Sequence, residues 1–179
     1  MTVHAYVDES KAGDYLLAAT LVDGARVHRV RQEVRRLVLP RQSRVHMKQE
    51  SDRRRRIIVG ALADLGVATT IYSASGPRAR THITRRRACL ARLVADVHDG
   101  CDRLVLESDE TQDARDRRDL LEITRVIGCR EVLAYEHRRA GQEPLLALPD
   151  VVAWCWARGG RVAATRRSAH RGHHRGVRS

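Results

Sequence analysis

The sequence predicts a single α/β domain built on a mixed β-sheet. In the second half of the chain, segments with the period of strands alternate with segments that have the period of helices, which is typical of parallel strands joined by crossover helices. The first two strand-like segments are instead separated by a short turn at residues 11–14, which favours an antiparallel hairpin. With 179 residues, 42% of them hydrophobic, the chain is long enough to bury a core of its own.

The first half of the chain contains two strand patterns followed by two helix patterns. Val3, Ala5 and Val7 alternate with other residues along the chain and form one apolar face, as on a half-buried strand. Apolar residues then recur with helical spacing in two segments, and the second of these stops at Gly66, a common helix-ending residue. In order, we expect strands over residues 3–8 and 15–22 and helices over residues 25–38 and 52–65. The helices form an insertion after the N-terminal hairpin.

The second half of the chain alternates between strands and helices. The strand that follows Gly100 is short and nearly all apolar, as expected of a strand covered on both faces. The last helix contains Pro149, and because proline is preferred at the first helical position, its regular part is expected to begin there. In order, we expect a strand over residues 67–74, a helix over 81–98, a strand over 103–107, a helix over 113–127, a strand over 131–136 and a helix over 145–157.

The C-terminal residues differ in composition from the rest of the chain. Beyond Gly159-Gly160 the segment is rich in Arg, His and Gly, and it contains six arginines and no acidic residue. Few apolar side chains are present to pay for ordering the backbone, so such a segment is expected to be disordered. We therefore predict one domain over residues 1–158 and a basic, disordered tail over residues 159–179.

Composition narrows the class of protein. The net charge of +12 is compatible with contact to nucleic-acid phosphates, although the C-terminal tail supplies half of it. No run of apolar residues approaches the ~20 needed to span a bilayer, and the N-terminus lacks the features of a secretory signal. The four cysteines are widely spaced without a C-x-x-C pair, which favours reduced thiols. We expect a cytoplasmic protein without membrane association; its oligomeric state is not predicted by these features.

Four consecutive arginines at residues 53–56 fall in the first turns of the second expected helix. Positive charge at this end of a helix opposes the helix dipole, which favours anions there. A carboxylate of the protein or a phosphate near these arginines would relieve the conflict.

Five acidic residues lie where the chain is otherwise apolar. Asp8 and Glu9 follow the first strand, Glu107 ends the fourth strand, and Asp109 comes two residues later. Asp150 lies in the least polar stretch of the chain. A carboxylate at such a place must be solvated, paired or bound to a metal, and only one of Asp8 and Glu9 can face a given site, because adjacent strand residues point to opposite faces. Each acid has an ordinary alternative: Asp8 as a solvated turn residue, and Asp150 as a first-turn acid stabilised by the helix dipole.

Four short motifs carry a resemblance to a known family. They are Tyr6-Val7-Asp8-Glu9-Ser10, His46-Met47-Lys48 with Glu50, Val105-Leu106-Glu107-Ser108-Asp109, and the stretch LLALPDVVAW at residues 145–154. Together, and in this order, they resemble domain-of-unknown-function family 3800 over residues 3–158. That family is similar in fold to ribonuclease H. The resemblance implies a ribonuclease H-like, five-stranded mixed sheet flanked by helices, with three strands antiparallel at one side.

The resemblance also implies a metal-dependent nuclease or phosphodiester-transfer enzyme that acts on DNA or RNA. Carried over to this chain, the carboxylates of Asp8, Glu107 (or Asp109) and Asp150 converge and bind Mg²⁺ or Mn²⁺, hard cations that prefer oxygen ligands. Glu9 is a further candidate ligand beside Asp8.

The motif around residue 47 adds three candidates to the implied site. Lys48 and His46 would hold a phosphate oxygen or transfer a proton, unless they are ordinary surface residues of a polar loop. Glu50 is a candidate metal ligand, since ribonuclease H has a glutamate on the helix after the third strand and that helix has no acid here before Asp96. Without such a replacement the metal site is incomplete, and the chain would be a non-catalytic nucleic-acid-binding or interaction protein. Whether the chain is an enzyme therefore stays open at this point.

Overall fold

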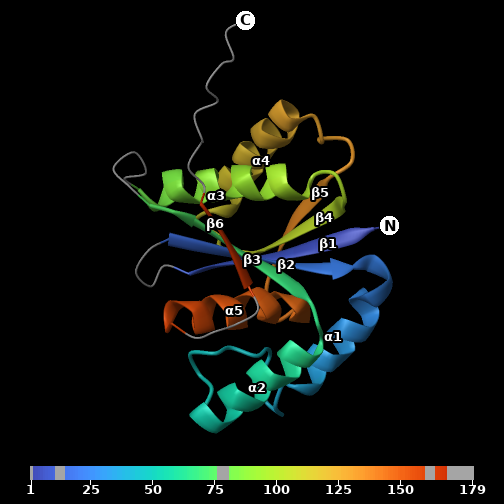
Figure 1. Cartoon of the computed structure of the whole chain (residues 1–179), viewed down its shortest axis with the longest axis vertical. Coiled ribbons are helices and arrows are strands. Elements are labelled where there is room, and N and C mark those ends of the chain that lie inside the picture. The colour runs from blue at the N-terminus through green and yellow to red at the C-terminus, as the bar shows by residue number, and fades with distance from the viewer. Residues whose placement is uncertain (1, 11–14, 76–80, 160–163, 169–179) are drawn as a thin grey trace, which may run out of the picture.

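A mixed β-sheet organises the part of the chain that this computed structural model describes, residues 2–10, 15–75, 81–159 and 164–168 (Figure 1). The strands are β1 (Val3–Ser10), β2 (Tyr15–Asp23), β3 (Ala68–Ala74), β4 (Cys101–Glu107), β5 (Ala134–Arg138) and β6 (Ala164–Ser168). They lie in the order β5-β4-β1-β2-β3-β6. β2 is antiparallel to both β1 and β3, and the other neighbouring pairs are parallel. The predicted mixed sheet of the five strands β1 to β5 is confirmed.

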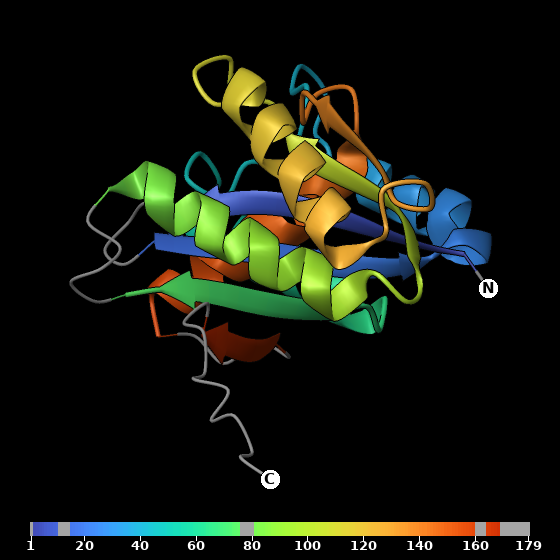
Figure 2. The same cartoon turned by 90° about the horizontal axis from the view of Figure 1, so that it is seen from above.

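Helices cover both faces of the sheet (Figures 1 and 2). One face carries α3 (His82–Val97) and α4 (Asp113–Ile127), and the other carries α5 (Ala147–Ala157). On the same side as α5 lie α1 (Val27–Arg36) and α2 (Asp52–Asp64), so the predicted helical insertion after the hairpin is present. Short 3₁₀ turns at Gly24–Arg26 and Pro144–Leu146 lead into α1 and α5.

Alternation along β1 directs its side chains into two different clusters of the core. Val7 belongs to the cluster beneath α3 and α4, whereas Tyr6 belongs to the cluster with side chains of α1, α2 and α5. Both are almost completely buried, and a fully buried large apolar side chain stabilises the fold by roughly 1.5–3 kcal/mol. Because neighbouring strand residues point to opposite faces, Asp8 lies on the side of α5 and Glu9 on the side of α3.

Several element boundaries differ from those predicted; β1, for example, runs on to Ser10 instead of ending at residue 8. The fifth strand starts at Ala134 instead of residue 131, because the N–H groups of Val132 and Leu133 both donate to the carbonyl of Cys129 and close a turn there. The last helix starts at Ala147, two residues before Pro149, since the preceding 3₁₀ turn runs directly into it. A proline is tolerated at this position because N–H groups in the first turn have no partner within the helix.

The C-terminal segment contributes a strand where we expected disorder. β6 pairs in parallel with β3, with Thr165 opposite Thr70 and Arg167 opposite Tyr72. The expectation of a disordered tail is therefore wrong for residues 164–168, while residues 160–163 and 169–179 lie outside the described part of the chain. The physical reason is that β3 would otherwise be an edge strand, whose free N–H and C=O groups bind a neighbouring backbone with little regard to side-chain polarity.

All four cysteines are free and buried, as their spacing predicted. None of the helices in the described ranges combines the length and the apolar composition that crossing a bilayer requires.

Candidate functional site

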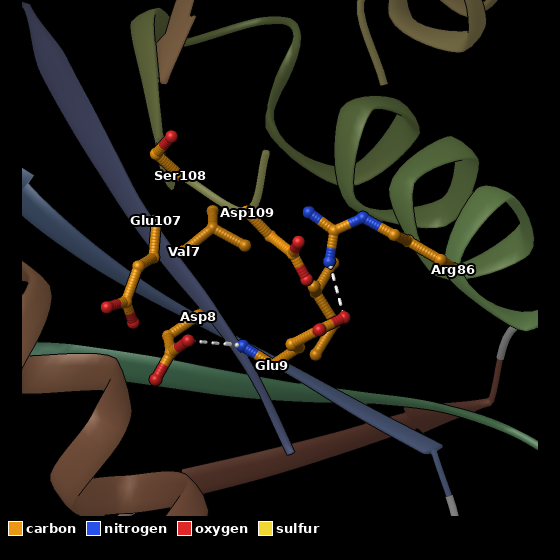
Figure 3. A pocket seen from close by; sticks show the side chains of 8 residues that line it. Val7, Asp8, Glu9, Arg86, Glu107, Ser108 and Asp109 are labelled. Atoms are coloured by element: carbon orange, nitrogen blue, oxygen red, sulfur yellow. Dashed lines mark hydrogen bonds and ion pairs between the residues drawn. The ribbon is translucent and has the colours of Figure 1, made fainter. Parts of the chain in front are cut away.

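Two carboxylates meet where the pairing between the parallel strands β1 and β4 ends. Val7 of β1 is paired with Leu106 of β4, so the residues that follow, Asp8 and Glu107, lie next to each other at the same edge of the sheet. Figure 3 shows their side chains pointing to the same side, away from Arg86. The strand register thus turns two acids that are far apart in the sequence into a close pair.

The helix α5 brings a third carboxylate to this pair. α5 packs against β1 and β2, and Asp150 lies in its first turn. A pocket of about 250 Å³ is lined by Asp8, Glu107 and Asp150 together; we call it the carboxylate pocket. The structure therefore brings together the three acids that the resemblance placed at one site, on the same side of the sheet.

Burial and the neighbouring charges change the affinity of Asp8 and Asp150 for protons. Burial, followed by the carboxylate of Glu107 and the charge of Asp150, raises the pKa of Asp8 well above its ordinary value. The N–H of Glu9, which donates to Oδ1 of Asp8 at 2.7 Å, acts in the opposite direction and is outweighed. Burial likewise raises the pKa of Asp150, although the N–H of Met47 lowers it in part. A divalent cation would relieve this crowding of negative charge.

A loop between α1 and α2 brings two further predicted residues to the carboxylate pocket. Val45 and Met47 are buried in the core, and His46 and Lys48, which alternate with them, line the pocket. Nδ1 of His46 is 3.7 Å from Oδ2 of Asp150, and the N–H of Met47 donates to the same oxygen at 3.3 Å. The buried side chains anchor the loop and thereby hold its polar side chains against the acids.

Arg44, from the same loop, forms an ion pair with Glu107 that sequence reasoning missed. Its Nη1 donates to Oε1 of Glu107, so one of the three carboxylates is neutralised by the protein itself. A single arginine is inconspicuous in a chain with 34 basic residues. Its position in the sequence could have identified it, because Arg44, like His46 and Lys48, alternates with the buried residues of this loop.

Glu9 and Asp109 line a second pocket of about 340 Å³ toward α3, which shares Asp8, Glu9 and Glu107 with the carboxylate pocket (Figure 3). Nη1 of Arg86 donates to Oε2 of Glu9 at 2.6 Å. The N–H and hydroxyl groups of Thr111 both donate to Oδ1 of Asp109, at 3.0 and 2.6 Å. Both acids therefore have partners within the protein; Glu9 also lines the carboxylate pocket, whereas Asp109 does not.

Glu50 lines neither of these two pockets. Its buried side chain accepts a hydrogen bond from Nε2 of Gln42 at 3.2 Å and lies 3.5 Å from Nε of Arg54. These contacts tie the loop to the start of α2. The structure thus does not bring Glu50 to the other carboxylates in place of the acid missing from α3.

A buried ionic network, which the sequence-based predictions also missed, holds Glu9 on the side of α3. Arg86, with a side chain only 7% exposed, donates from Nε and Nη2 to the two carboxylate oxygens of Asp116 at 2.7 and 2.6 Å. Tyr15 donates its hydroxyl to Oε2 of Glu9 at 2.7 Å, and Nε2 of His137 lies 3.1 Å from Oδ2 of Asp116. Burial pushes the pKa of Asp116 up, but the bonds from Arg86 and His137 outweigh it, so that the pKa is lowered. The network thus holds Glu9, the neighbour of Asp8 on β1, from the side of α3.

The three carboxylates of the pocket are suitable ligands for a divalent cation, but two of them already interact with other groups of the protein. Three carboxylates form the all-oxygen donor set that Mg²⁺ and Mn²⁺ prefer. Among the described residues, however, no three His, Cys, Asp or Glu side chains are already grouped around a common metal position. Arg44 holds Glu107, and the N–H of Met47 holds Asp150. Cation binding by all three acids would therefore replace the contact between Arg44 and Glu107.

Comparison with known proteins supports the fold. The chain is similar to a chain in the solved structure of the PCNA:RNase HII complex from Archaeoglobus fulgidus, with a TM-score of 0.56 and 18% identity, over 89% of this chain and 72% of that chain. The likeness shows a ribonuclease H-like fold. No family model and no curated protein sequence matches the chain. The resemblance to family 3800 accordingly stays a prediction.

Proposed function

We propose that the chain is a metal-dependent nuclease or phosphodiester-transfer enzyme that acts on DNA or RNA at the carboxylate pocket. The observation that carries this proposal is the convergence of Asp8, Glu107 and Asp150, from β1, β4 and α5, on one pocket. Burial and mutual repulsion raise the pKa of both Asp8 and Asp150, so the folded protein holds these acids together at a cost in free energy. Such a cost is expected of a site whose purpose is to bind a cation.

The residues around the pocket have the chemistry that phosphodiester cleavage needs. Asp8, Glu107 and Asp150 would hold Mg²⁺ or Mn²⁺, which when bound stabilises charge on the entering and leaving oxygens of the phosphodiester. Lys48 supplies an ammonium group that binds a phosphate oxygen. His46, held near Asp150, would transfer a proton at the leaving oxygen.

The fold and the charge of the chain support a nucleic-acid substrate. The similar chain belongs to a complex that contains a ribonuclease, and the likeness supports the proposal at the level of fold. The net charge of +12 favours association with a polyanion.

A non-catalytic nucleic-acid-binding protein with the same fold is the second candidate. The specific observation that favours it is the ion pair between Arg44 and Glu107, in which an arginine supplies the charge that a metal would otherwise supply. The absence of an acid on α3 before Asp96 points in the same direction. In this case the basic residues bind nucleic acid and the carboxylate pair has a structural role.

Thermal unfolding with Mn²⁺ tests the metal site directly. We expect saturating Mn²⁺, at about a hundred-fold excess over its Kd, to raise the Tm of the wild-type protein by about 5–10 °C, because the cation binds the folded state alone. Asp8→Asn should remove this shift, whereas Asp64→Asn, which changes an exposed acid at the end of α2, should keep it. An unchanged Tm of the wild-type protein would argue against the metal site and in favour of the second candidate.

A cleavage assay then tests the reaction. We expect the wild-type protein to cut at least one of single-stranded DNA, duplex DNA, single-stranded RNA and an RNA–DNA hybrid with Mn²⁺ or Mg²⁺, and EDTA to stop the reaction. Binding of these substrates without cleavage under either metal would overturn the enzymatic proposal.

A further inference from the structure

One aromatic side chain lies at the boundary between the carboxylate pocket and a neighbouring groove. Trp154 follows Asp150 by four residues on α5, so the two side chains share one face of the helix. Trp154 lines the carboxylate pocket and also a groove of about 550 Å³, whose other lining residues, among them Arg55, Arg56 and Val59, belong to α2. The groove therefore continues from the acids, past the indole ring, along α2.

Two guanidinium groups lie over this indole ring. Cζ of Arg55 is 4.9 Å and Cζ of Arg158 is 4.1 Å from the ring centroid, within the range of cation–π contacts. Arg55 is fixed, since its Nε donates to the carbonyl of Met47 at 3.0 Å and its Nη1 to Asp52 at 2.7 Å. Arg158 is exposed, and within the described part of the chain its side chain has no hydrogen bond or ion pair. A ligand with a flat ring can therefore take the place of Arg158 on the indole.

Packing alone does not account for a tryptophan at this position. Its Nε1 is buried without a hydrogen-bond partner among the described residues, which costs free energy that a phenylalanine or leucine would not incur. Tyr6, Tyr15 and Tyr72 are buried in the core, whereas Trp154 keeps part of its ring accessible beside the acids. An accessible aromatic ring next to basic side chains is the arrangement on which proteins stack unpaired bases.

The charge along the groove suits a phosphate backbone. Of the four arginines at the start of α2, Arg54 and Arg55 are paired with Glu50 and Asp52. Arg53 and Arg56 are exposed and have no ion-pair partner among the residues that the structure describes. The conflict between these charges and the helix dipole is therefore only half relieved within the protein, and phosphates in the groove would relieve the rest.

From these contacts we infer that Trp154 stacks a nucleobase of single-stranded nucleic acid whose backbone follows α2 and leads into the carboxylate pocket. Single strands are preferred over duplexes for a geometric reason. In a duplex the faces of each base are covered by neighbouring bases, whereas an unpaired base has a face free to stack on a protein ring. This inference rests on the proposed function, since it names the substrate class of the same site.

Binding measured in EDTA tests the stacking role apart from cleavage. The probes are a fluorescein-labelled oligothymidylate, the same strand with abasic sites throughout, and a blunt duplex, followed by fluorescence anisotropy. Trp154→Leu removes the ring but keeps apolar volume, and we expect it to weaken binding of oligothymidylate by about ten-fold and to leave the abasic strand and the duplex within about two-fold of wild type. Trp154→Phe should restore most of the affinity, and Trp156→Leu, two residues along α5, is the matched control.

A second measurement does not depend on the stability of the Leu variant. In a Trp156→Phe protein Trp154 is the remaining tryptophan, since the chain has two, and we expect oligothymidylate but not the abasic strand to quench its fluorescence. Absence of quenching, or an equal loss of affinity for all three probes in Trp154→Leu, would overturn the stacking role. Selective loss in a protein that cleaves nothing with metal would overturn the enzymatic proposal and leave the stacking site in place.

Discussion

Asp8→Asn is expected to lower the rate of metal-dependent cleavage by at least about 100-fold while the protein stays folded. Asp8 interacts with both other acids of the pocket, since after burial the charges of Glu107 and Asp150 raise its pKa. An uncharged amide in its place binds a divalent cation poorly, but its oxygen still accepts the hydrogen bond from the N–H of Glu9. The measurement is the initial cleavage rate with Mn²⁺, with Asp64→Asn as the matched control. Cleavage at the wild-type rate would remove Asp8 from the mechanism.

The same substitution is expected to stabilise the metal-free protein at neutral pH. The folded state raises the pKa of Asp8, so the folded state binds its proton more tightly than the unfolded state does. The resulting stability is fully present below the ordinary pKa of aspartate and is lost as the pH rises through the raised pKa. The substituted amide does not titrate, and the advantage of the variant over the wild type should therefore grow with pH and vanish in acid. Urea unfolding in EDTA across this range measures it, and parallel pH profiles would contradict the expectation.

Arg86→Ala is expected to lower the free energy of unfolding by about 3–5 kcal/mol, the largest effect on stability that we predict. The substitution leaves the carboxylate of Asp116, which is 1% exposed, buried without its cation, and it also frees Glu9 from its ion pair. Arg87→Ala is the matched control, because Arg87 is 41% exposed and its pairs with Asp119 and Glu122 lie nearer the surface. That control should cost no more than about 1 kcal/mol. Urea unfolding measures both changes.

Two further results would separate loss of the ion pair from loss of packing. Replacing both partners, as Arg86→Met with Asp116→Leu, should recover part of the stability, because the carboxylate of Asp116 is then gone, whereas Glu9 still lacks its ion pair with Arg86. The pKa of Asp116 is lowered in the fold, so its contribution to stability is present at neutral pH and is lost as the pH falls through that lowered pKa. The difference between wild type and Arg86→Ala should therefore shrink in acid. An effect of Arg86→Ala as small as that of Arg87→Ala would refute the role of the network.

Local patterns were sufficient to predict most elements and part of the site. The alternation of Val3, Ala5 and Val7 predicted β1 and also that Asp8 and Glu9 face opposite sides. Errors arose where backbone hydrogen bonds that the apolar periodicity does not reveal decided the structure. The turn in which Val132 and Leu133 donate to the carbonyl of Cys129 delays the start of β5. The free edge of β3 pairs with β6, which comes from a segment whose composition predicted disorder.

The sequence by itself determined the order of the elements from β1 to α5, the α/β class and the acids that could form a site, because periodicity and burial preference depend on residues that are near neighbours in the chain. The resemblance implied that Asp8 and Asp150 meet Glu107 or Asp109, and the tertiary structure decided that Glu107 joins them in the pocket and that Asp109 and Glu50 do not. The register of Val7 against Leu106 placed Asp8 beside Glu107, and the packing of α5 added Asp150. It also decided the partners of Arg44 and Arg86, since an arginine side chain is compatible with solvent, a buried carboxylate or a phosphate, and only the contacts made by distant segments select among these.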